Sequence, residues 1–387
     1  MLTTIKPADR ASLIGFSDIV KIRNRVLDMK SRGSRVLQLE GGEPFMPTPD
    51  FIKDAMREAL AQNQTRYAPS SGVPQLLEAI RAKLAAKNAI NAEMRDIIVT
   101  SGGAHALFCA FQASVNPGDD VMFFAPYWTP IKDQVTFAGG SPVRVPWDEV
   151  RDVEDLRPIL DGRCTARTRV IYVNSPANPT GDVLSRAQLE SVARFAVANN
   201  LIVIADEAYE DLLYDTPHVS LASLPEMRER TITVFTLSKS FAMTGWRIGY
   251  LVAPPPLMEF IRKLVLNSVN GVSTPTQFAA AAAIAHSRDW FAAHLDEYRR
   301  RRDHLVRGLN QAGFRCLTPP GAFYVFPDAR ERLGNDSWKA METLLERTSI
   351  ASVPGVVFGP EGEGHLRMSF SISVETLEAA VAALKSL

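Results

Sequence analysis

The sequence predicts an α/β fold, in which helices cover both faces of a mostly parallel central sheet, with a smaller α+β domain attached. The first observation is that short, almost wholly apolar strands alternate with amphipathic helices along most of the 387 residues. Strands of this kind are buried on both faces, which is typical of parallel sheets between two helical layers. The second is a change of pattern near the C-terminus, where a long Arg-rich helix is followed by a mixture of short strands and helices.

The elements of the larger domain follow from their caps and their apolar runs. Thr48-Pro49-Asp50 supplies the cap and first turn of one helix, and Asn116-Pro117-Gly118 stops another. Val, Ile and Phe dominate the predicted strands. In chain order, we expect helices at 50–62, 75–88, 104–115 and 185–199, and strands at 96–100, 120–124, 170–173, 201–205, 231–237 and 248–252.

The C-terminal part predicts the smaller domain. We expect a helix at 289–312, apolar segments at 314–317 and 322–326, a helix near 337–348, a strand near 365–371 and a final helix from Val374. The N-terminal stretch up to Pro47 is expected to pack with them. The predicted large domain therefore covers residues 48–288, and the small domain with an N-terminal arm covers 1–47 and 289–387. No shift in composition marks either boundary.

Charge and cysteine content narrow the class of protein. Lys plus Arg and Asp plus Glu each number 43, and this zero net charge argues against nucleic-acid or membrane-surface binding. No apolar run is long enough to span a bilayer, and the N-terminus lacks the apolar core of a signal peptide. The three isolated cysteines indicate neither a disulfide framework nor a metal site, so we expect a cytoplasmic protein without a metal.

Polar residues follow several of the predicted strands, at the edge where a parallel sheet binds ligands. Lys239 follows the apolar run 231–237, and a desolvated lysine there has a lowered pKa and acts as a nucleophile. Taken alone, such a lysine more often reaches solvent along its own stem. Asp206 ends another apolar strand. A carboxylate buried there needs a hydrogen-bond or charge partner, although Asp206 could instead simply cap a helix.

Three other strand ends carry groups suited to a flat, phosphorylated ligand. Ser101-Gly102-Gly103-Ala104 opens a helix, and free backbone N–H groups there favour phosphate, although small residues also serve any tight turn. Trp128 could stack its aromatic face on a planar ligand, or it could be a core residue. A loop with two prolines and a glycine presents Asn178. No Walker lysine or GxGxxG pattern is present, which disfavours nucleotides.

One cofactor uses all of these groups together, namely pyridoxal 5'-phosphate (PLP). It carries a phosphate, a flat ring, a phenolic oxygen, a pyridine nitrogen that a carboxylate keeps protonated, and an aldehyde that bonds to a lysine. We therefore predict that the chain binds PLP at the carboxyl ends of its parallel strands.

The motifs resemble those of the fold-type I PLP enzymes, specifically the class I/II aminotransferases of the aspartate aminotransferase superfamily. The resemblance runs from Gly41-Gly42-Glu43-Pro44 to His365-Leu366-Arg367-Met368-Ser369, nearly the whole chain. The most specific blocks are Ser238-Lys239 with Gly245–Tyr250, and Asn178-Pro179-Thr180-Gly181 followed by Asp206-Glu207-Ala208-Tyr209.

The resemblance implies a role toward PLP for each matching residue. Lys239 is the expected Schiff-base lysine and proton shuttle, and Asp206 the partner of the pyridine nitrogen. Asn178 and Tyr209 are expected to donate to the phenolic oxygen, and Trp128 to stack on the ring. The expected phosphate ligands are Gly103, Ala104, Ser238 and Arg247, with Gly102 in the same turn.

The resemblance also implies a substrate site and a partner subunit. Arg367 and Gly42 are expected to bind the substrate α-carboxylate, Arg367 by a two-pronged guanidinium contact, with Asn178 beside them. Tyr67 resembles the tyrosine that reaches the phosphate of the neighbouring subunit. A homodimer is therefore expected, in which Tyr67 and also Asn270 complete the neighbouring site.

The implied activity is that of a PLP-dependent amino acid:2-oxo acid aminotransferase with a ping-pong Schiff-base mechanism, in which Lys239 moves the substrate Cα proton. A PLP lyase, such as a C–S β-lyase or an aminocyclopropane-carboxylate-synthase-like enzyme, uses the same lysine and aspartate and stays an alternative. A PLP-sensing regulator is disfavoured, because such proteins carry an N-terminal DNA-binding module and the region before Gly42 is too short for one.

The substrate side chain is the least determined feature. The chain departs from the family pattern at Gly103-Ala104-His105 and at Phe45-Met46-Pro47, and we find no second arginine or lysine for a dicarboxylate side chain. We therefore expect aromatic or other neutral amino acids as substrates, with an aspartate-specific aminotransferase as the alternative. The expected pocket residues are Ile14, Gly15, Phe16, Phe45, Tyr127, Phe323 and the partner subunit's Asn270.

Overall fold

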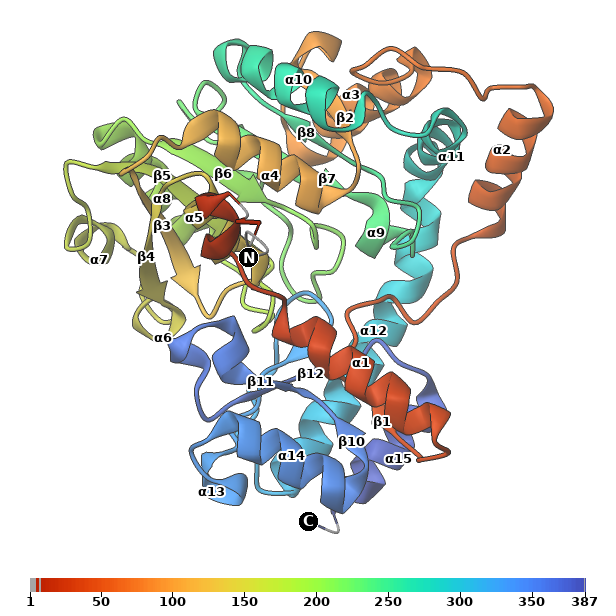
Figure 1. The fold of residues 1–387 in the computed structure, drawn as a ribbon, viewed down its shortest axis with the longest axis vertical. Helices are drawn as coiled ribbons and strands as arrows, with labels where there is room; N and C mark the ends of the chain where they lie inside the picture. Colours follow the sequence, from red (N-terminus) through yellow and green to blue (C-terminus); the bar gives the residue numbers. More distant parts are fainter. Residues whose placement is uncertain (1–4, 7, 386) are drawn as a thin grey trace.

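The computed structural model describes residues 5, 6, 8–385 and 387 and is built on a seven-stranded sheet (Figure 1). Its strands are β2 (Ile97–Thr100), β3 (Asp120–Ala125), β4 (Ser141–Pro146), β5 (Thr168–Asn174), β6 (Ile202–Asp206), β7 (Thr231–Thr236) and β8 (Gly249–Val252). They lie in the order β2-β8-β7-β6-β5-β3-β4. Only β8 runs antiparallel to its two neighbours, so the expectation of a mostly parallel sheet is confirmed.

Helices cover both faces of this sheet. Along β3, Val121 and Phe123 pack on one face with α4 and α10, while Met122 and Phe124 pack on the other with α8. This alternation is the period of two that a strand imposes on its side chains. The helices of this lobe are α2 (Asp50–Ala61), α3 (Pro74–Asn88), α4 (Gly103–Ser114), α5 (Pro130–Phe137), α6 (Trp147–Val150), α7 (Arg157–Asp161), α8 (Arg186–Ala198), α9 (Leu237–Ser240), α10 (Pro255–Val269) and α11 (Thr274–Ala285).

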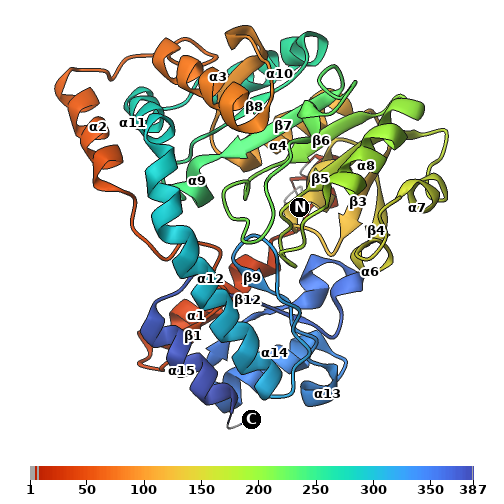
Figure 2. The ribbon, with the colours of Figure 1, turned by 180° about the vertical axis from the view of Figure 1, so that it is seen from behind.

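A second, smaller lobe is joined to the first by the long helix α12 (Ser287–Gln311), which runs from one lobe into the other (Figures 1 and 2). It contains a parallel pair, β1 (Leu37–Gln38) with β10 (Ile350–Ala351), and an antiparallel sheet of β11 (Val353–Pro354), β12 (Leu366–Ser369) and β9 (Tyr324–Val325). Its other helices are α1 (Asp18–Ser31), α13 (Arg330–Leu333), α14 (Ser337–Thr348) and α15 (Val374–Leu384). Short 3-10 helices occur at Asp9–Leu13, Met94–Asp96, Leu221–Ser223, Gly355–Phe358 and Pro360–Gly362.

The smaller lobe has its own apolar core, in which Leu305 of α12, Leu344 of α14 and Phe370 are fully buried together. The smaller α+β unit is therefore present, although the boundaries at residues 48 and 288 stay predictions, and residues 1–4 and 7 of the predicted arm lie outside the described part. None of the described helices has the length and apolar content that crossing a bilayer requires.

Three local features differ from the sequence expectation. The run 231–237 ends as a strand at Thr236, whose Oγ1 accepts a hydrogen bond of 3.2 Å from the N–H of Ser238 and so caps α9. Segment 314–317 makes only an isolated bridge between Arg315 and Asp328. β4 was not expected, because it contains Pro142 and Pro146, which an edge strand tolerates.

Candidate active site

Lys239 lies on the first turn of chain after β7, and its amine enters a cavity at the carboxyl edge of the sheet. Nζ donates a hydrogen bond of 2.6 Å to the carbonyl oxygen of Gly42. Burial, together with the nearby guanidinium groups of Arg367 and Arg247, lowers the pKa of Lys239 to about 8. About a tenth of this amine is therefore unprotonated at pH 7, far more than for an ordinary lysine, and the unprotonated amine is the nucleophilic form.

Asp206 is the last residue of β6, and its buried carboxylate faces the same cavity. Oδ2 accepts a hydrogen bond of 2.7 Å from Tyr172 Oη, and Oδ1 accepts one of 3.2 Å from the backbone N–H of Ala208. Burial raises the pKa of Asp206 to about 6, and these two hydrogen bonds act against that rise. The carboxylate therefore stays ionised above this pH in a site that excludes water.

The loop after β5 brings Asn178 and Arg367 together. The side-chain oxygen of Asn174 accepts from the N–H of Asn178 at 2.9 Å and so shapes the loop. Asn178 Oδ1 then accepts from Nη1 of Arg367 at 3.1 Å, while Arg367 Nη2 donates to the carbonyl oxygen of Glu40 at 2.7 Å. Nε of this buried arginine has no hydrogen-bond partner, which marks it as a donor awaiting a ligand.

Two tyrosines form the wall opposite the strand ends. The hydroxyl oxygens of Tyr209 and Tyr324 lie 3.1 Å apart, and both side chains are buried. Burial raises the pKa of Tyr209 well above its ordinary value, so its hydroxyl stays protonated and can donate. Gly42 closes against the same wall, because a Cβ at this position would lie 2.8 Å from Tyr324 Oη.

The turn before α4 forms a pocket for an anion. Gly102 has a φ of +81°, which favours glycine, and a Cβ there would lie 2.7 Å from Nη2 of Arg247. Arg247 is held at 2.8 Å by the carbonyl oxygen of Thr244. Ser238 and the first residues of α4 line the cavity beside it. A glycine turn, the N-terminus of a 12-residue helix and a guanidinium group together suit a phosphate.

The cavity has a volume of about 280 Å³ and collects nearly all of the predicted site residues. Trp128 also lines it, and its side chain is half-buried. Among the residues assigned above to PLP or to the substrate α-carboxylate, Gly102 and Tyr67 do not line the cavity, and Gly102 lies against Arg247, which does.

Comparisons with known proteins agree with this geometry. The model of the aminotransferase class I and II family matches residues 34–384. The chain belongs to this family. It is 38% identical to a probable aspartate/prephenate aminotransferase of Aquifex aeolicus, over 98% of this chain and 97% of that protein. It is 35% identical to an aromatic-amino-acid aminotransferase of Thermococcus litoralis, over 97% of this chain and 96% of that protein.

Solved structures of aminotransferases show the same fold. The Thermus thermophilus aspartate aminotransferase with maleate superposes with a TM-score of 0.94 at 37% identity, and the match covers 99% of each chain. The protein is therefore a PLP-dependent aminotransferase of fold type I. The PLP-lyase alternative finds no support among these relatives.

The residues of this aminotransferase fit PLP on observations of their own. The unpartnered Nε of Arg367, the glycine cradle in front of Arg247, the buried carboxylate of Asp206 and the partly desolvated amine of Lys239 line or border one cavity. The cradle beside Arg247 suits the phosphate of the cofactor, Asp206 its pyridine nitrogen and Lys239 its aldehyde, while the unpartnered donor of Arg367 suits the carboxylate of a substrate.

Several residues expected near the substrate do not line the cavity. Ile14 and Gly15 line a neighbouring pocket beside α5, and the side chain of Phe16 is 92% exposed. Phe45 packs edge-on against Tyr298, with their ring centroids 4.9 Å apart. Tyr127 packs against Phe123, and Phe323 is a core residue whose ring centroid lies 5.9 Å from Lys239 Nζ.

Tyr67 and Asn270 also lie away from the cavity of their own chain. The side chain of Tyr67 is 91% exposed, and Asn270 is an exposed C-cap of α10 with a φ of +51°. Ile19 and Leu107 supply the apolar lining instead. Ile19, Tyr172 and Tyr324 were not predicted from the sequence. The two tyrosines lie within short apolar strands, where a tyrosine is typical of a core residue.

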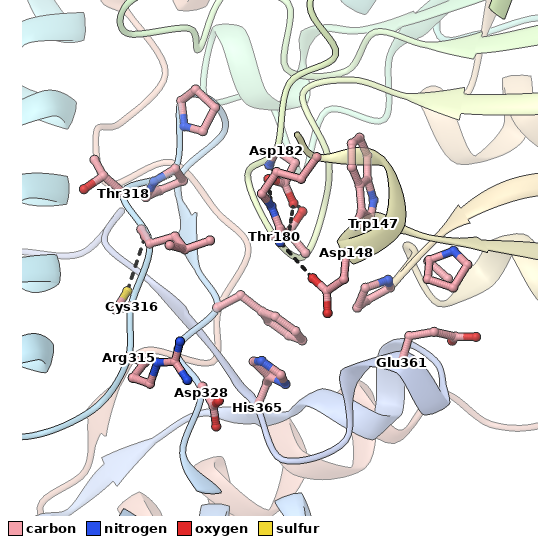
Figure 3. Close-up of a pocket in the computed structure, with 18 of the residues that line it drawn as sticks. Trp147, Asp148, Thr180, Asp182, Arg315, Cys316, Thr318, Asp328, Glu361 and His365 are labelled. Carbon is pink, nitrogen blue, oxygen red and sulfur yellow. Dashed lines mark hydrogen bonds and ion pairs between the residues drawn. The ribbon is translucent and has the colours of Figure 1, made fainter. Parts of the chain in front are cut away.

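A second, larger cavity of about 770 Å³ lies between the two lobes and contains none of the predicted site residues (Figure 3). Two pairs of opposite charges are found among its lining residues. Asp182 accepts from Arg151 at 3.0 Å, and Asp328 accepts from Arg330 at 2.6 Å. Paired charges of this kind leave little for a charged ligand to bind.

A buried polar cluster lies behind the active site, between α3 and the segment after β6. Glu207 accepts from His218 at 2.7 Å and from Ser220 at 2.6 Å. Glu210 accepts hydrogen bonds from Lys83 and Asn88. Ligand atoms of Glu207, Glu210 and His218 lie within 4.8 Å of one another, but these protein donors already engage them.

Proposed function

We propose that this aminotransferase bonds PLP through Lys239, keeps the pyridine nitrogen protonated through the ionised carboxylate of Asp206 and holds the substrate α-carboxylate through Arg367. The observation that carries the proposal is the convergence of one amine, one buried carboxylate and one guanidinium with a free donor in a single cavity. Because these three charges come from three different elements, their meeting is hard to explain by packing alone.

The lysine and the aspartate have complementary tasks. When bound, PLP supplies an aldehyde that condenses with amines and a ring that accepts electrons released at the substrate Cα. The Lys239 amine, with a pKa of about 8, takes a proton from the substrate Cα atom and returns it. Ionised Asp206 holds the proton on the pyridine nitrogen. Tyr209 and Asn178 serve as the donors to the phenolic oxygen.

The substrate carboxylate and the cofactor phosphate would be bound by two different arginines of the cavity. An α-carboxylate accepts from Nε of Arg367 and shares its fixed fork with Asn178 and Glu40. Gly42 leaves room for it beside Tyr324. The phosphate binds the turn in front of Arg247, with ligands Gly102, Gly103, Ala104 and Ser238.

The lining of the cavity supports neutral or aromatic amino acids as substrates. Among the described residues that line it, the cations are Lys239, Arg247 and Arg367, and each already has a task. No further cation among them is left for a side-chain carboxylate, whereas Ile19 and Leu107 offer apolar surface. The names of the relatives favour aspartate instead, so aspartate is the competing substrate.

A panel of amino donors tests this choice. With 2-oxoglutarate as a common acceptor, kcat/KM should be higher for phenylalanine, methionine and glutamine than for aspartate. A strong preference for aspartate would overturn the neutral-substrate proposal while leaving the roles of Lys239, Asp206 and Arg367 intact.

We also propose a cytoplasmic homodimer. The support is the exposure of Tyr67 and Asn270 far from their own cavity, beside exposed apolar side chains such as Leu266 and Val269. Mixing Lys239→Ala subunits with Tyr67→Ala subunits tests it, because each hybrid dimer regains one site with both residues. Activity at limiting PLP should rise on mixing, and no rise would contradict a shared site. Three cysteines without disulfides support the reducing compartment.

A further inference from the structure

Tyr172 reaches the active-site aspartate from outside the cavity. It lies within β5, it is 2% exposed, and its ring packs against Phe111 with centroids 5.9 Å apart. It does not line the cavity, yet its hydroxyl donates the hydrogen bond of 2.7 Å to Asp206 Oδ2. This hydroxyl is the one side-chain donor to the Asp206 carboxylate in the described part of the chain.

The two oxygens of Asp206 are held differently. Oδ1 accepts from the backbone N–H of Ala208, a contact that the turn after β6 fixes whatever the side chains are. Oδ2 depends on Tyr172, because Asn174, the neighbouring polar residue of β5, donates instead to the backbone carbonyl oxygen of Asp206 at 3.1 Å. Removing the Tyr172 hydroxyl would therefore leave one buried carboxylate oxygen without its donor.

We propose that Tyr172 is a positioning residue for Asp206, which fixes the rotation of the carboxylate and keeps it ionised so that it can hold the proton of the PLP pyridine nitrogen. The inference rests on the proposed role of Asp206 and adds to it a residue that never touches cofactor or substrate.

The charges around Asp206 show why this donor matters. Burial and, to a smaller extent, Glu207 raise the pKa of Asp206, whereas Tyr172, Ala208 and Lys239 lower it, and the balance leaves it at about 6. Tyr209 also faces the carboxylate, but as a neutral phenol. Burial raises the pKa of Tyr172 well above its ordinary value, so this hydroxyl keeps its proton across the working pH range.

Tyr172→Phe removes the donor and leaves the ring. Losing one hydrogen bond to a buried charge is expected to raise the pKa of Asp206 by about one unit or more. Tight cofactor binding requires the ionised carboxylate, so affinity falls as pH drops through this pKa. The fall should therefore begin about one unit higher in the variant than in the wild type.

The measurement is the dissociation constant of PLP for the full-length protein, taken across pH by the visible absorbance of the bound cofactor. The dissociation constant of Tyr172→Phe should be about twofold higher than that of the wild type at neutral pH and about tenfold higher near pH 5, and the two should converge at alkaline pH. Ionisations of PLP itself are common to both proteins, so the difference between the curves isolates Asp206.

Tyr214→Phe is the matched control. Tyr214 is equally buried, and its hydroxyl donates to the carbonyl oxygen of Ala322 in the small lobe, away from the cavity. It loses a buried tyrosine hydrogen bond to a neutral carbonyl oxygen, so its melting temperature should fall while its pH curve matches the wild type. Tyr172→Leu, a second variant without the hydroxyl, should show the same upward shift as Tyr172→Phe.

Asp206→Asn distinguishes a failure of the proposed role of Asp206 from a failure of the proposed role of Tyr172. This variant should bind PLP weakly at every pH and lose the wild-type pH dependence. If Asp206→Asn keeps the wild-type curve, the proposed role of Asp206 fails. Suppose instead that Asp206→Asn behaves as expected. The positioning role of Tyr172 is then overturned if the pH curves of Tyr172→Phe and Tyr172→Leu both superimpose on that of the wild type. It is also overturned if the curve of Tyr214→Phe shifts as much as theirs.

Discussion

Arg367 of the small lobe and Asn178 of the large lobe are joined by a buried hydrogen bond, with Nη1 3.1 Å from Oδ1. The two residues are 189 positions apart, and the contact aligns the guanidinium over the ring of Tyr324, whose centroid lies 4.5 Å away. The arginine is thus set in place by groups from both lobes, with Nε left to bind a substrate.

Replacement of Arg367 tests this arrangement. Arg367→Lys keeps the charge but loses the fixed fork, so KM for amino-acid substrates should rise by about ten- to a hundredfold, the value of one or two charge-assisted hydrogen bonds. Steady-state kinetics on both half-reactions measure it. Arg315→Lys, an exposed arginine of the same lobe, is the control and should leave KM unchanged. An unaltered KM in Arg367→Lys would remove the carboxylate role.

The lowered pKa of Lys239 predicts how its reactivity depends on pH. The unprotonated fraction of the amine grows as pH rises through about 8 and then levels off, whereas an ordinary lysine would keep gaining until above pH 10. The rate at which PLP becomes attached, followed by borohydride trapping and peptide mass analysis, should show this early plateau. The added mass of the reduced cofactor should be found on the peptide that contains Lys239, and it should be absent when the Lys239→Ala variant is treated in the same way. A rate still climbing at pH 10 contradicts the desolvated amine.

Two glycines with similar backbone angles separate strain from function. Gly102 and Gly118 have φ of +81° and +90°, but only a Cβ at Gly102 meets a side chain, that of Arg247. Both Gly102→Ala and Gly118→Ala should lose about 1 kcal/mol of stability or more from the positive φ, and the loss should be larger at Gly102, whose ψ of 170° lies in a region almost restricted to glycine. Only Gly102→Ala should also weaken PLP binding, because it displaces Arg247. Equal PLP affinity in the two variants would argue against a phosphate site at this turn.

The buried pair of Lys83 and Glu210 predicts a pH-dependent loss of stability. Burial raises the pKa of Glu210, but Lys83 and Lys87 outweigh it and hold the pKa below its ordinary value. Glu210 therefore contributes stability above the pKa of an unfolded glutamate, and this contribution is lost as pH falls below it. Lys83→Met should cost about 3–5 kcal/mol near neutral pH, because it leaves a buried carboxylate poorly paired.

Urea unfolding at neutral and acidic pH measures this effect. The difference between Lys83→Met and the wild type should shrink in acid, where Glu210 becomes protonated. Lys263→Met breaks the exposed pair with Glu259 and should cost under about 1 kcal/mol at either pH. If Lys83→Met lowers the free energy of unfolding by no more than Lys263→Met does, the buried pair contributes little to stability.

The chemistry of the site was predictable from the sequence because its residues break the local pattern. A lysine or an aspartate at the end of an apolar strand is a weak signal by itself, and Lys239 and Asp206 were predicted as site residues only when the groups at several strand ends were considered together. Several predicted helices and strands matched to within a residue or two, since they carry strong caps and apolar runs, as in α14 and α15.

The shape of the substrate pocket was not predictable from the sequence. Phe45 was expected to line it, but Tyr298 of α12 and the guanidinium of Arg301 hold its ring elsewhere. Which way a side chain points depends on elements hundreds of residues away. Tyr172 was missed for the opposite reason, because it fits a buried strand and only its hydroxyl, aimed at Asp206, reveals a second use.

The hydrogen bond from Lys239 Nζ to the carbonyl oxygen of Gly42 links the reactive amine to backbone 197 positions earlier in the chain. A free lysine ammonium carries three N–H groups, but a nitrogen bonded to an aldehyde carbon keeps at most one. Gly42 and the cofactor thus compete for the same nitrogen. If Lys239 is bonded and released in each turnover as proposed, this contact would weaken and re-form with it, and the N-terminal segment would be held more tightly at one stage of catalysis than at the next.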